Sequence, residues 1–367
     1  MIITMNKTRT RFAPSPTGYM HIGNLRTALF EFLIAKHEGG DFLLRIEDTD
    51  QERKVEGAVD VIYKTLKECG LNWDEGPDIG GDFGPYVQSE RLPMYKGYAE
   101  DLIKLGGAHY CFCSEEEIEA QSLGISFKFN DPCKHLSAEE VQAKLDAGEP
   151  YVIRQTIKDV GETYFDDEVY GRIEVDGDVL DEQILIKSDG YPTYNFANII
   201  DDHQMQISHV VRGNEYLSST PKYNLIYDAY GWQRPTYVHV PPVMKDEHHK
   251  LSKRNGDASF QDLVAKGYLP DAIMNYIALL GWAPETEQEI YTLDELIKVF
   301  NIHRISKSPA IFDIDKLTWM NGVYLRNMDE ETYYETVRPY LEKAVHGAYN
   351  LKEIAKIIQP RIDILNQ

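Results

Sequence analysis

The stretch "RFAPSPTGYMHIGNLRTALF", residues 11–30, joins the short β-type run "TRTRF" (8–12) to a helix through a turn rich in proline and glycine. Apolar residues spaced i, i+3, i+4, i+7 and i+8 predict one buried helix face, formed by Leu25, Ala28, Leu29, Phe32 and Leu33. Gly39 and Gly40 end this helix, and "DFLLRIED", residues 41–48, follows as a buried strand. A strand, a helix and a strand of this length favour a parallel sheet with a right-handed crossover, in which ligands bind beyond the carboxyl ends of the strands.

A second pattern of the same kind covers residues 183–243. Strand "QILIK" (183–187) leads to a turn and a short helix in "GYPTYNFANIIDDH" (190–203), and strand "ISHVVR" (207–212) follows. The segment "STPKYNLIYDAYGW" (219–232) is predicted to be a helix with Ser/Thr caps and with Pro221 in its first turn, and "YVHVPPV" (237–243) to be another strand. Two such halves predict one doubly wound α/β sheet with an insertion between them.

The insertion and the region after the sheet differ in character. The insertion, about 92–190, carries several short β-type stretches and three of the four cysteines. After residue 255 the sequence changes to amphipathic helices in "SFQDLVAKGYLPDAIMNYIALLGW" (259–282) and "TLDELIKVFNI" (292–302), and it stays helical beyond about 330.

Composition limits the classes of protein. A chain of 367 residues is long enough for two or three domains, and it has no apolar run that could span a bilayer. The N-terminus lacks the pattern of a signal peptide, and four cysteines do not make a disulfide framework, so a cytoplasmic location is predicted. The net charge of −22 argues against a generic polyanion binder. A local basic surface can still bind nucleic acid, and acidity also favours solubility.

The turn in residues 11–30 has the chemistry of a phosphate site. A helix N-terminus presents unpaired N–H groups, and Gly18 and Gly23 let a ligand approach the backbone. His21 can donate a hydrogen bond to a phosphoryl group. Taken alone, "HIGN" (21–24) is more typical of a turn with a solvated histidine.

A second stretch, "KDEHHKLSKRNGD" (245–257), places Lys250, Lys253 and Arg254 within five residues, before a flexible Asn-Gly. A cationic loop of this kind could bind a triphosphate and stabilise the negative charge that develops on pyrophosphate as it leaves. An isolated basic pentapeptide is more often a solvated loop.

Together and in this order, "HIGN" and "KLSKR" (250–254) resemble the two ATP-binding boxes of class I aminoacyl-tRNA synthetases. The motifs "RFAPSPTG", "RIEDTD" (45–50), "DGYPTYNFANIIDDH" (189–203) and "HKLSKRNGD" (249–257) are similar to those of bacterial-type glutamyl-tRNA synthetases, from about residue 8 to the end. The resemblance implies activation of glutamate by ATP, with release of pyrophosphate, and transfer to the 3′-terminal ribose of tRNA-Glu. It also implies that tRNA has to bind before glutamate is activated.

The resemblance implies a class I synthetase fold divided into five segments. These are the first half of a Rossmann-like catalytic domain at 1–91, an α+β insertion that binds the acceptor end at 92–194, the second half at 195–245, a helical stem-contact domain with the KLSKR loop at 246–330, and the start of a truncated anticodon-binding domain at 331–367.

For ATP, bound with Mg²⁺, the implied residues are His21, Gly23, Asn24, Glu215, Lys250, Lys253 and Arg254, of which His21, Lys250 and Lys253 are catalytic. Asn24 stands where the class motif has a second histidine, a position at which glutamyl enzymes vary.

For glutamate, a guanidinium suits each carboxylate and an anion suits the ammonium. By resemblance, Arg11 and Tyr194 contact the side-chain carboxylate with Asn198 nearby, Arg212 binds the α-carboxylate, Glu47 binds the α-amino group, and Ser15 also contacts substrate. Ordinary ion pairs, Glu47 with Arg45 or Asp48 with Arg11, are the alternative.

The insertion carries a candidate metal site. "CFC" (111–113) and "CKH" (133–135) offer Cys111, Cys113, Cys133 and His135, which can close a tetrahedral zinc site, with buried free thiols as the alternative. The resemblance implies structural zinc there, since some glutamyl synthetases bind zinc at these positions. Cys69, which falls in a predicted helix, is expected in the core.

Three other functions fit parts of this pattern. They are a glutamyl-queuosine tRNA synthetase, which normally ends soon after a degenerate second box, a glutaminyl-tRNA synthetase, and a non-catalytic tRNA- or nucleotide-binding paralogue. The intact KLSKR box and the presence of both His21 and Lys253 favour the glutamate enzyme. The expected partners are tRNA-Glu and L-glutamate, with no membrane and a monomeric state.

Overall fold

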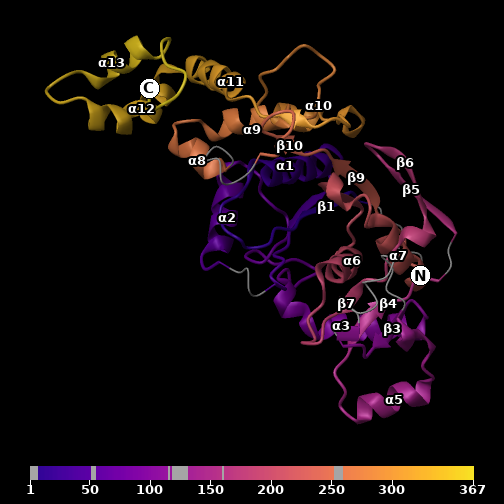
Figure 1. Ribbon diagram of the computed structural model, residues 1–367. Helices are drawn as coiled ribbons and strands as arrows, with labels where there is room; N and C mark the ends of the chain where they lie inside the picture. Colours follow the sequence, from indigo (N-terminus) through magenta and orange to yellow (C-terminus); the bar gives the residue numbers. More distant parts are fainter. Residues whose placement is uncertain (1–6, 51–54, 115, 118–130, 159–160, 252–258) are drawn as a thin grey trace. The chain divides into compact units, whose positions relative to one another are not determined.

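The computed structural model describes residues 7–50, 55–114, 116–117, 131–158, 161–251 and 259–367 (Figure 1). The chain divides into two compact units, each assembled from segments that are distant in sequence. The first comprises Met1–Ser15, Leu43–Lys54 and Asp74–His239, and the second comprises Pro16–Phe42, Val55–Trp73 and Val240–Gln367.

The first unit contains a four-stranded mixed sheet. Its strand order is β6-β5-β9-β8, where β5 (Glu162–Asp167) pairs antiparallel with β6 (Gly171–Asp176) and parallel with β9 (Thr236–Val240). Strand β1 (Arg9–Phe12) lies beside β8 (His209–Gly213) and pairs with β2 (Asp41–Leu44). All four residues of β1 are buried, as expected for a strand inside an α/β fold.

Two helices of the first unit, α6 (Tyr194–Gln204) and α7 (Thr220–Tyr230), pack against each other. Their apolar residues join one core, which includes Phe196, Ile200, Tyr223 and Ile226. Pro221 stands in the first turn of α7 and a serine is its N-cap residue, both as predicted. The N-cap residue Ser219 makes no side-chain capping bond.

The first unit also contains a smaller antiparallel sheet with the strand order β3-β4-β7, and this sheet includes a strand that the sequence places in the doubly wound sheet. Strand β7 (Ile184–Ile186), within the predicted strand "QILIK", pairs with β4 (Val152–Gln155), and β4 pairs with β3 (Ala108–Cys111). The prediction of a strand is confirmed, but its place in the doubly wound sheet is wrong. Helices α3 (Leu92–Lys104) and α5 (Ala138–Asp146) and the 3₁₀ turn η3 (Pro132–His135) complete this region.

Helix α1 (Ile22–His37) is the central helix of the second unit. The predicted apolar face is buried, but Phe30, Ile34 and Ala35 are buried as well, so the helix is covered on most sides. It packs against α9 (Pro270–Ala278) and α10 (Leu293–Val299). Arg26, inside this core, donates from its guanidinium to the carbonyls of Leu280 and Pro241.

The segment predicted to be helical over 259–282 forms two helices. Helix α8 (Phe260–Ala265) ends before Gly267, and α9 starts at Pro270. Gly267 has φ +95°, and an added Cβ would lie 2.7 Å from the backbone nitrogen of Asn366, so only glycine fits there.

The remaining elements of the second unit are α2 (Ala58–Glu68), β10 (Val243–Met244), β11 (Ala310–Ile311), α11 (Ile314–Asn327), α12 (Glu330–Ala344) and α13 (Leu351–Ile358). The helices predicted after residue 330 are thus present. Within the ranges that the structure describes, no helix combines the length and the apolarity needed to cross a membrane.

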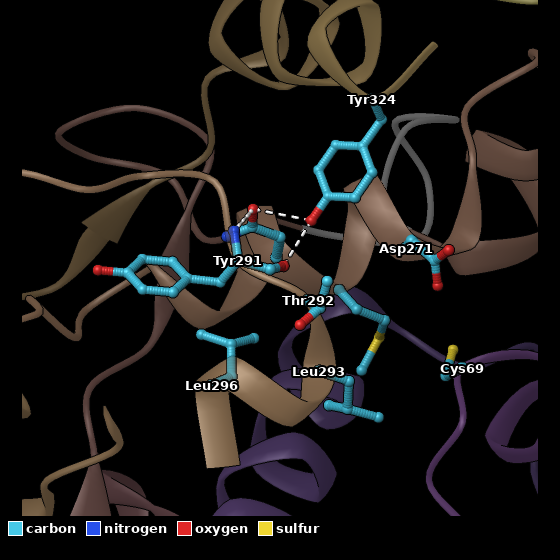
Figure 2. A pocket seen from close by; sticks show the side chains of 9 residues that line it. Cys69, Asp271, Tyr291, Thr292, Leu293, Leu296 and Tyr324 are labelled. Carbon is cyan, nitrogen blue, oxygen red and sulfur yellow. Dashed lines mark hydrogen bonds between the residues drawn. The ribbon is translucent and has the colours of Figure 1, made fainter. Parts of the chain in front are cut away.

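Cys69 follows α2 directly and is buried, as predicted for a core residue, although it caps the helix rather than lying within it. It lines a cavity of about 120 Å³ enclosed by residues of α9, α10 and α11 (Figure 2). Asn275 holds the wall of this cavity together, because its Oδ1 accepts hydrogen bonds from Tyr291 N and from the Tyr324 hydroxyl, both at 2.9 Å. None of the predicted site residues lines it.

Candidate active site

His21 is the N-cap residue of α1. Its Nδ1 accepts a hydrogen bond of 3.0 Å from the Gly23 backbone N–H, which places the ring proton of the neutral tautomer on Nε2. The Nε2–H group is therefore a donor at the N-terminal end of the helix, where an anion is favoured. A side chain at Gly23 would be tight, since an added Cβ would lie 3.2 Å from the same Nδ1 and the ring would have to shift.

Backbone contacts in the second unit connect the start of α1 with the segment that follows the second predicted ATP box. Residue 21 forms an antiparallel bridge with Ser259, and Phe260 N donates to Met20 O at 3.2 Å. On the other side of the second box, Lys250 forms a bridge with Met244 of β10. The exposed Lys250 is thus fixed by its backbone, whereas Lys253 and Arg254 lie outside the described residues.

Arg212, at the end of β8, is 7% exposed and has no carboxylate partner among the described residues. Its Nε donates to Nε2 of His239 at 3.1 Å, and its Nη2 donates to the Thr220 hydroxyl at 2.8 Å. The rings of Tyr223 and Tyr216 lie 4.8 Å and 5.2 Å from its Cζ. A buried guanidinium with only neutral partners is a site for an anion.

Tyr194 begins α6, and the charges of the predicted glutamate pocket act on it. Burial and then the nearby Glu47 raise the pKa of Tyr194 well above its ordinary value, while Arg212 and Arg11 act in the opposite direction. The structure thus brings these three charged residues around one tyrosine. Tyr216 lies against the Tyr194 ring, with centroids 5.5 Å apart.

Asn198, one turn further along α6, is 2% exposed, and its Nδ2 is a buried donor with no hydrogen-bond partner in the described part of the chain. A buried amide donor without an acceptor costs free energy unless a ligand supplies the acceptor. Asn198 therefore also suits a carboxylate ligand.

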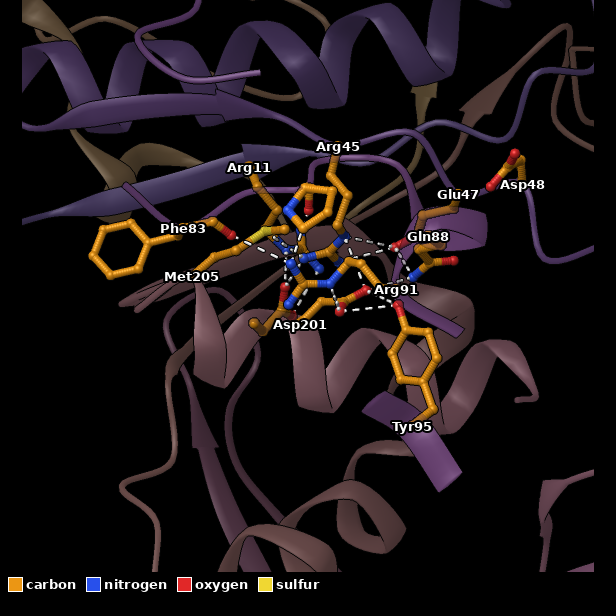
Figure 3. A network of polar contacts seen from close by, with 12 residues as sticks. Arg11, Arg45, Glu47, Asp48, Phe83, Gln88, Arg91, Tyr95, Asp201 and Met205 are labelled. Atoms are coloured by element: carbon orange, nitrogen blue, oxygen red, sulfur yellow. Dashed lines mark hydrogen bonds and ion pairs between the residues drawn. The ribbon is translucent and has the colours of Figure 1, made fainter. Parts of the chain in front are cut away.

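Arg11 and Glu47 are held in a buried network of alternating charges (Figure 3). Asp202 accepts from Arg11 Nε at 2.8 Å and from Arg45 Nη1 at 2.8 Å. Arg45 in turn pairs with Glu47 at 2.9 Å, so the alternative ion pair Glu47–Arg45 does form. This pairing orients the Glu47 carboxylate and does not exclude an ammonium ligand.

Asp201 extends this network to the helix α3. Its carboxylate accepts from Arg91 Nε at 2.7 Å, from Gln88 at 2.8 Å and from the Tyr95 hydroxyl. The three arginines Arg11, Arg45 and Arg91 are matched by three carboxylates, those of Glu47, Asp201 and Asp202, so this buried set is neutral as a whole.

The pKa shifts follow from these contacts. Burial would raise the pKa of Asp202, but Arg11 and Arg45 outweigh it and hold the pKa below its ordinary value. Burial raises the pKa of Glu47 despite the opposing effect of Arg45. A bound ammonium group would favour the ionised form of Glu47.

The two other predicted contacts lie at the surface. Ser15 is exposed. Glu215 is also exposed, and its carboxylate folds back over Gly213, where an added Cβ would lie 2.2 Å from Oε2. Asn24, in the first turn of α1 beside Gly23, is exposed as well.

The candidate metal site contains one ligand that differs from the prediction. The sulfur atoms of Cys111, Cys113 and Cys133 and a carboxylate oxygen of Asp131 all lie within 4.8 Å of one another. His135 is not in this group, because η3 ends there with its side chain exposed, and Asp131 takes the fourth position. The Sγ atoms of Cys113 and Cys133 are 3.7 Å apart, which fits two thiolates on a tetrahedral zinc ion with Zn–S bonds of about 2.3 Å.

Contacts around Asp131 support this geometry. His109 Nε2 lies 2.9 Å from Asp131 Oδ2, and the Cys133 backbone N–H donates to Oδ1 at 2.8 Å. Burial would raise the pKa of Asp131, but these hydrogen bonds hold it well below its ordinary value. Burial raises the pKa of the Cys111 thiol to about 11, so a metal would be needed to keep this sulfur a thiolate.

Sequence patterns did not single out the residues that support the two candidate sites. These are Asp131 in the metal site, and Asp167, Asp201, Asp202 and His239 around the glutamate pocket. The only signal was the adjacent acidic pair in "IIDDH", which occupies two buried positions of a helix where carboxylates are rare unless paired.

Comparison with known proteins identifies the family of this chain. The family model for the catalytic domain of class I tRNA synthetases (E and Q) matches residues 7–319. The glutamate–tRNA ligase of Clostridium botulinum is 60% identical across 99% of this chain and 76% of its own length, and that of Clostridium tetani is 59% identical across 99% and 75%.

Among solved structures, the glutamate tRNA ligase of Elizabethkingia meningosepticum, crystallised in complex with its amino acid, superposes with a TM-score of 0.91. It is 36% identical, and the match covers 98% of this chain and 78% of that one. The fold is therefore that of a class I synthetase, a mixed α/β fold with a parallel sheet and helices. With this sequence identity over nearly its whole length, the chain belongs to the glutamate–tRNA ligase family of class I tRNA synthetases.

Proposed function

We propose that this chain activates L-glutamate with ATP and transfers it to tRNA-Glu. In the first step the α-carboxylate of glutamate attacks the α-phosphorus of ATP, which forms glutamyl-adenylate and releases pyrophosphate. In the second step a hydroxyl of the 3′-terminal ribose displaces AMP. Membership of the glutamate–tRNA ligase family supports this assignment.

The observation that carries the proposal is the buried Arg212 without an ionic partner among the described residues. Its charge is available for the α-carboxylate of an amino acid. Asn198 adds a second unsatisfied donor on α6, and Glu47 supplies the anion for the ammonium group. Arg11, Tyr194 and Ser15 complete the proposed glutamate pocket.

For ATP, the proposed ligands are His21 Nε2–H, the backbone of Gly23 and Asn24 at the start of α1, and Glu215 on the adenosine side. Lys250, Lys253 and Arg254 would offset the charge on the departing pyrophosphate. Mg²⁺ is proposed to bind with the phosphates, since ATP normally enters such reactions as its magnesium complex.

A structural zinc ion is proposed on Cys111, Cys113 and Cys133 with Asp131. When bound, this ion would fix the 3₁₀ turn η3 to β3 and so shape the insertion. We further propose that the catalytic domain consists of two halves, residues 1–91 and 195–245. The insertion at 92–194 binds the tRNA acceptor end, and residues 246–330 contact the tRNA stem. Residues 331–367 are the start of the anticodon-binding domain. A cytoplasmic location and a monomeric state complete the proposal.

The test is ATP–pyrophosphate exchange with and without tRNA-Glu, together with aminoacylation of separated tRNA-Glu and tRNA-Gln. Arg212→Gln should raise the KM for glutamate by about tenfold or more and leave the KM for ATP nearly unchanged, since a charge-assisted contact to substrate is lost. A variant with the glutamate KM of the wild type would reject Arg212 as the carboxylate partner.

A further inference from the structure

His239 lies fully buried on β9, between a carboxylate and the guanidinium of Arg212. Its Nε2 accepts from Arg212 Nε at 3.1 Å, and its Nδ1 lies 2.6 Å from Asp167 Oδ2. An arginine can only donate, so Nε2 carries no proton and Nδ1–H donates to Asp167. One tautomer of the neutral imidazole is thereby fixed.

Asp167, the last residue of β5, is itself fixed by the backbone. Its Oδ1 accepts from Val169 N at 3.0 Å and from Tyr170 N at 2.8 Å, and its Oδ2 accepts from His239 N at 3.1 Å. With the bond from His239 Nδ1, this carboxylate has four donors. It is therefore a rigid anchor that holds the imidazole ring in one orientation.

The two arginines of the proposed glutamate pocket are held in different ways. Arg11 bonds directly to the carboxylate of Asp202, which places a negative charge against its guanidinium. Among the described residues, Arg212 donates to the uncharged acceptors His239 Nε2 and Thr220 Oγ1, and the carboxylate of Asp167 lies on the other side of the His239 ring.

From this difference we propose that His239, oriented by Asp167, is a positioning residue that aligns Arg212 while leaving its positive charge for the α-carboxylate of the substrate. An acidic residue in the place of His239 would align the guanidinium equally well but would cancel its charge. An apolar residue would leave the charge but not the alignment. The neutral imidazole meets both requirements.

This inference rests on the proposed role of Arg212 in glutamate binding. It predicts a specific defect in recognition of the α-carboxylate rather than a general loss of activity. The matched probe is 4-aminobutyrate, which has the amine and the distal carboxylate of glutamate but lacks the α-carboxylate. Its inhibition constant against glutamate reports binding that does not depend on Arg212.

The experiment compares the wild type with His239→Leu, His239→Gln and Arg212→Gln in ATP–pyrophosphate exchange with tRNA present. His239→Leu should raise the glutamate KM by about tenfold or more, keep the ATP KM within about twofold, and leave the inhibition constant of 4-aminobutyrate nearly unchanged. His239→Gln keeps one acceptor and one donor, so it should restore the glutamate KM to within about threefold of the wild type.

The outcomes separate the two proposals. If Arg212→Gln raises the glutamate KM and folded His239→Leu does not, the positioning role of His239 is wrong and the proposed function stands. If Arg212→Gln itself leaves the glutamate KM unchanged, the proposed role of Arg212 is wrong. Should His239→Leu not fold, His239→Asn replaces it, because asparagine keeps the interior polar but is too short to reach both Asp167 and Arg212. An unchanged glutamate KM in folded His239→Asn would equally overturn the positioning role.

Discussion

Asp202 on α6 bonds to Arg11 on β1 through both of its carboxylate oxygens, at 2.8 Å from Nε to Oδ1 and 3.2 Å from Nη2 to Oδ2. The same carboxylate also accepts from Arg45, which holds Glu47. One helix residue thus fixes the two groups proposed to bind opposite ends of glutamate, the distal carboxylate and the ammonium.

Replacing Asp202 with Asn should therefore damage both stability and glutamate binding. The change leaves Arg11 and Arg45 buried with one negative charge fewer, which we expect to cost about 3 kcal/mol of the free energy of unfolding. Urea unfolding measures this loss, and pyrophosphate exchange should show a higher glutamate KM at a nearly constant ATP KM. Asp228→Asn, which breaks the more exposed pair with Arg234, is the control and should cost less than about 1 kcal/mol. A folded Asp202→Asn variant with normal glutamate KM would show that Arg11 needs no such anchor.

Gly23 tests the ATP site at the start of α1. In Gly23→Ala the new Cβ would lie 3.2 Å from His21 Nδ1, so the ring has to shift away from its capping position. We expect the ATP KM to rise by about fivefold, the scale of one weakened hydrogen bond to a charged group, while the glutamate KM changes little. In the control Gly97→Ala, the added Cβ of α3 meets no atom within 4 Å, and the kinetic constants should not change. Equal ATP KM values in both variants would argue against a role of His21 in phosphate binding.

The elements that sequence patterns predicted well are those decided by local residues. The periodicity of α1, the proline in the first turn of α7 and the short apolar runs of β8 and β9 are local signals, and the structure confirms all of these elements. The pairing partner of a strand is not local. "QILIK" is a strand, but its place beside β4 depends on contacts with residues 152–155, which no periodicity encodes.

The same distinction applies to the site. Residues proposed to touch substrate stand in motifs, so family resemblance could point to them. Asp202 and His239 contact partners 191 and 27 residues away in the chain, and their role depends on those contacts. Asp131 was missed because the resemblance pointed to His135 as the fourth ligand. The turn at η3 leaves His135 exposed and brings Asp131 to the three sulfur atoms.

The metal site gives a direct comparison of these two candidate ligands. We expect the purified protein to hold one zinc ion per chain and His135→Asn to keep it. Asp131→Asn should weaken zinc binding by about 10- to 100-fold, because the change removes a charged ligand and its contact with His109. Competition with a chromogenic chelator measures the affinity, and Cys133→Ser gives the value for a lost thiolate. Zinc loss in His135→Asn with retention in Asp131→Asn would favour the ligand set read from the sequence.

His203 provides a test of stability against pH. Its ring is stacked on Trp232 with centroids 3.6 Å apart, and burial lowers its pKa to about 4 from the ordinary 6.5. At pH 7 the native state does not bind the proton, and His203 of the unfolded chain is mostly neutral. As the pH falls from about 6.5 towards 4, the unfolded state takes up a proton that the native state does not, so the free energy of unfolding decreases.

Replacing His203 with Phe keeps an aromatic ring on Trp232 and removes the titrating group. Between pH 7 and pH 5 the wild type should lose about 1 kcal/mol more stability than this variant, a value reduced from the full shift because solvent reaches part of the ring. Urea unfolding followed by tryptophan fluorescence at the two pH values measures both losses. The buried His239, whose pKa burial also lowers, contributes equally to both proteins and cancels in the comparison. Equal losses in wild type and variant would mean that the native state binds this proton as readily as the unfolded chain, and that the stacked ring is not sheltered from protonation.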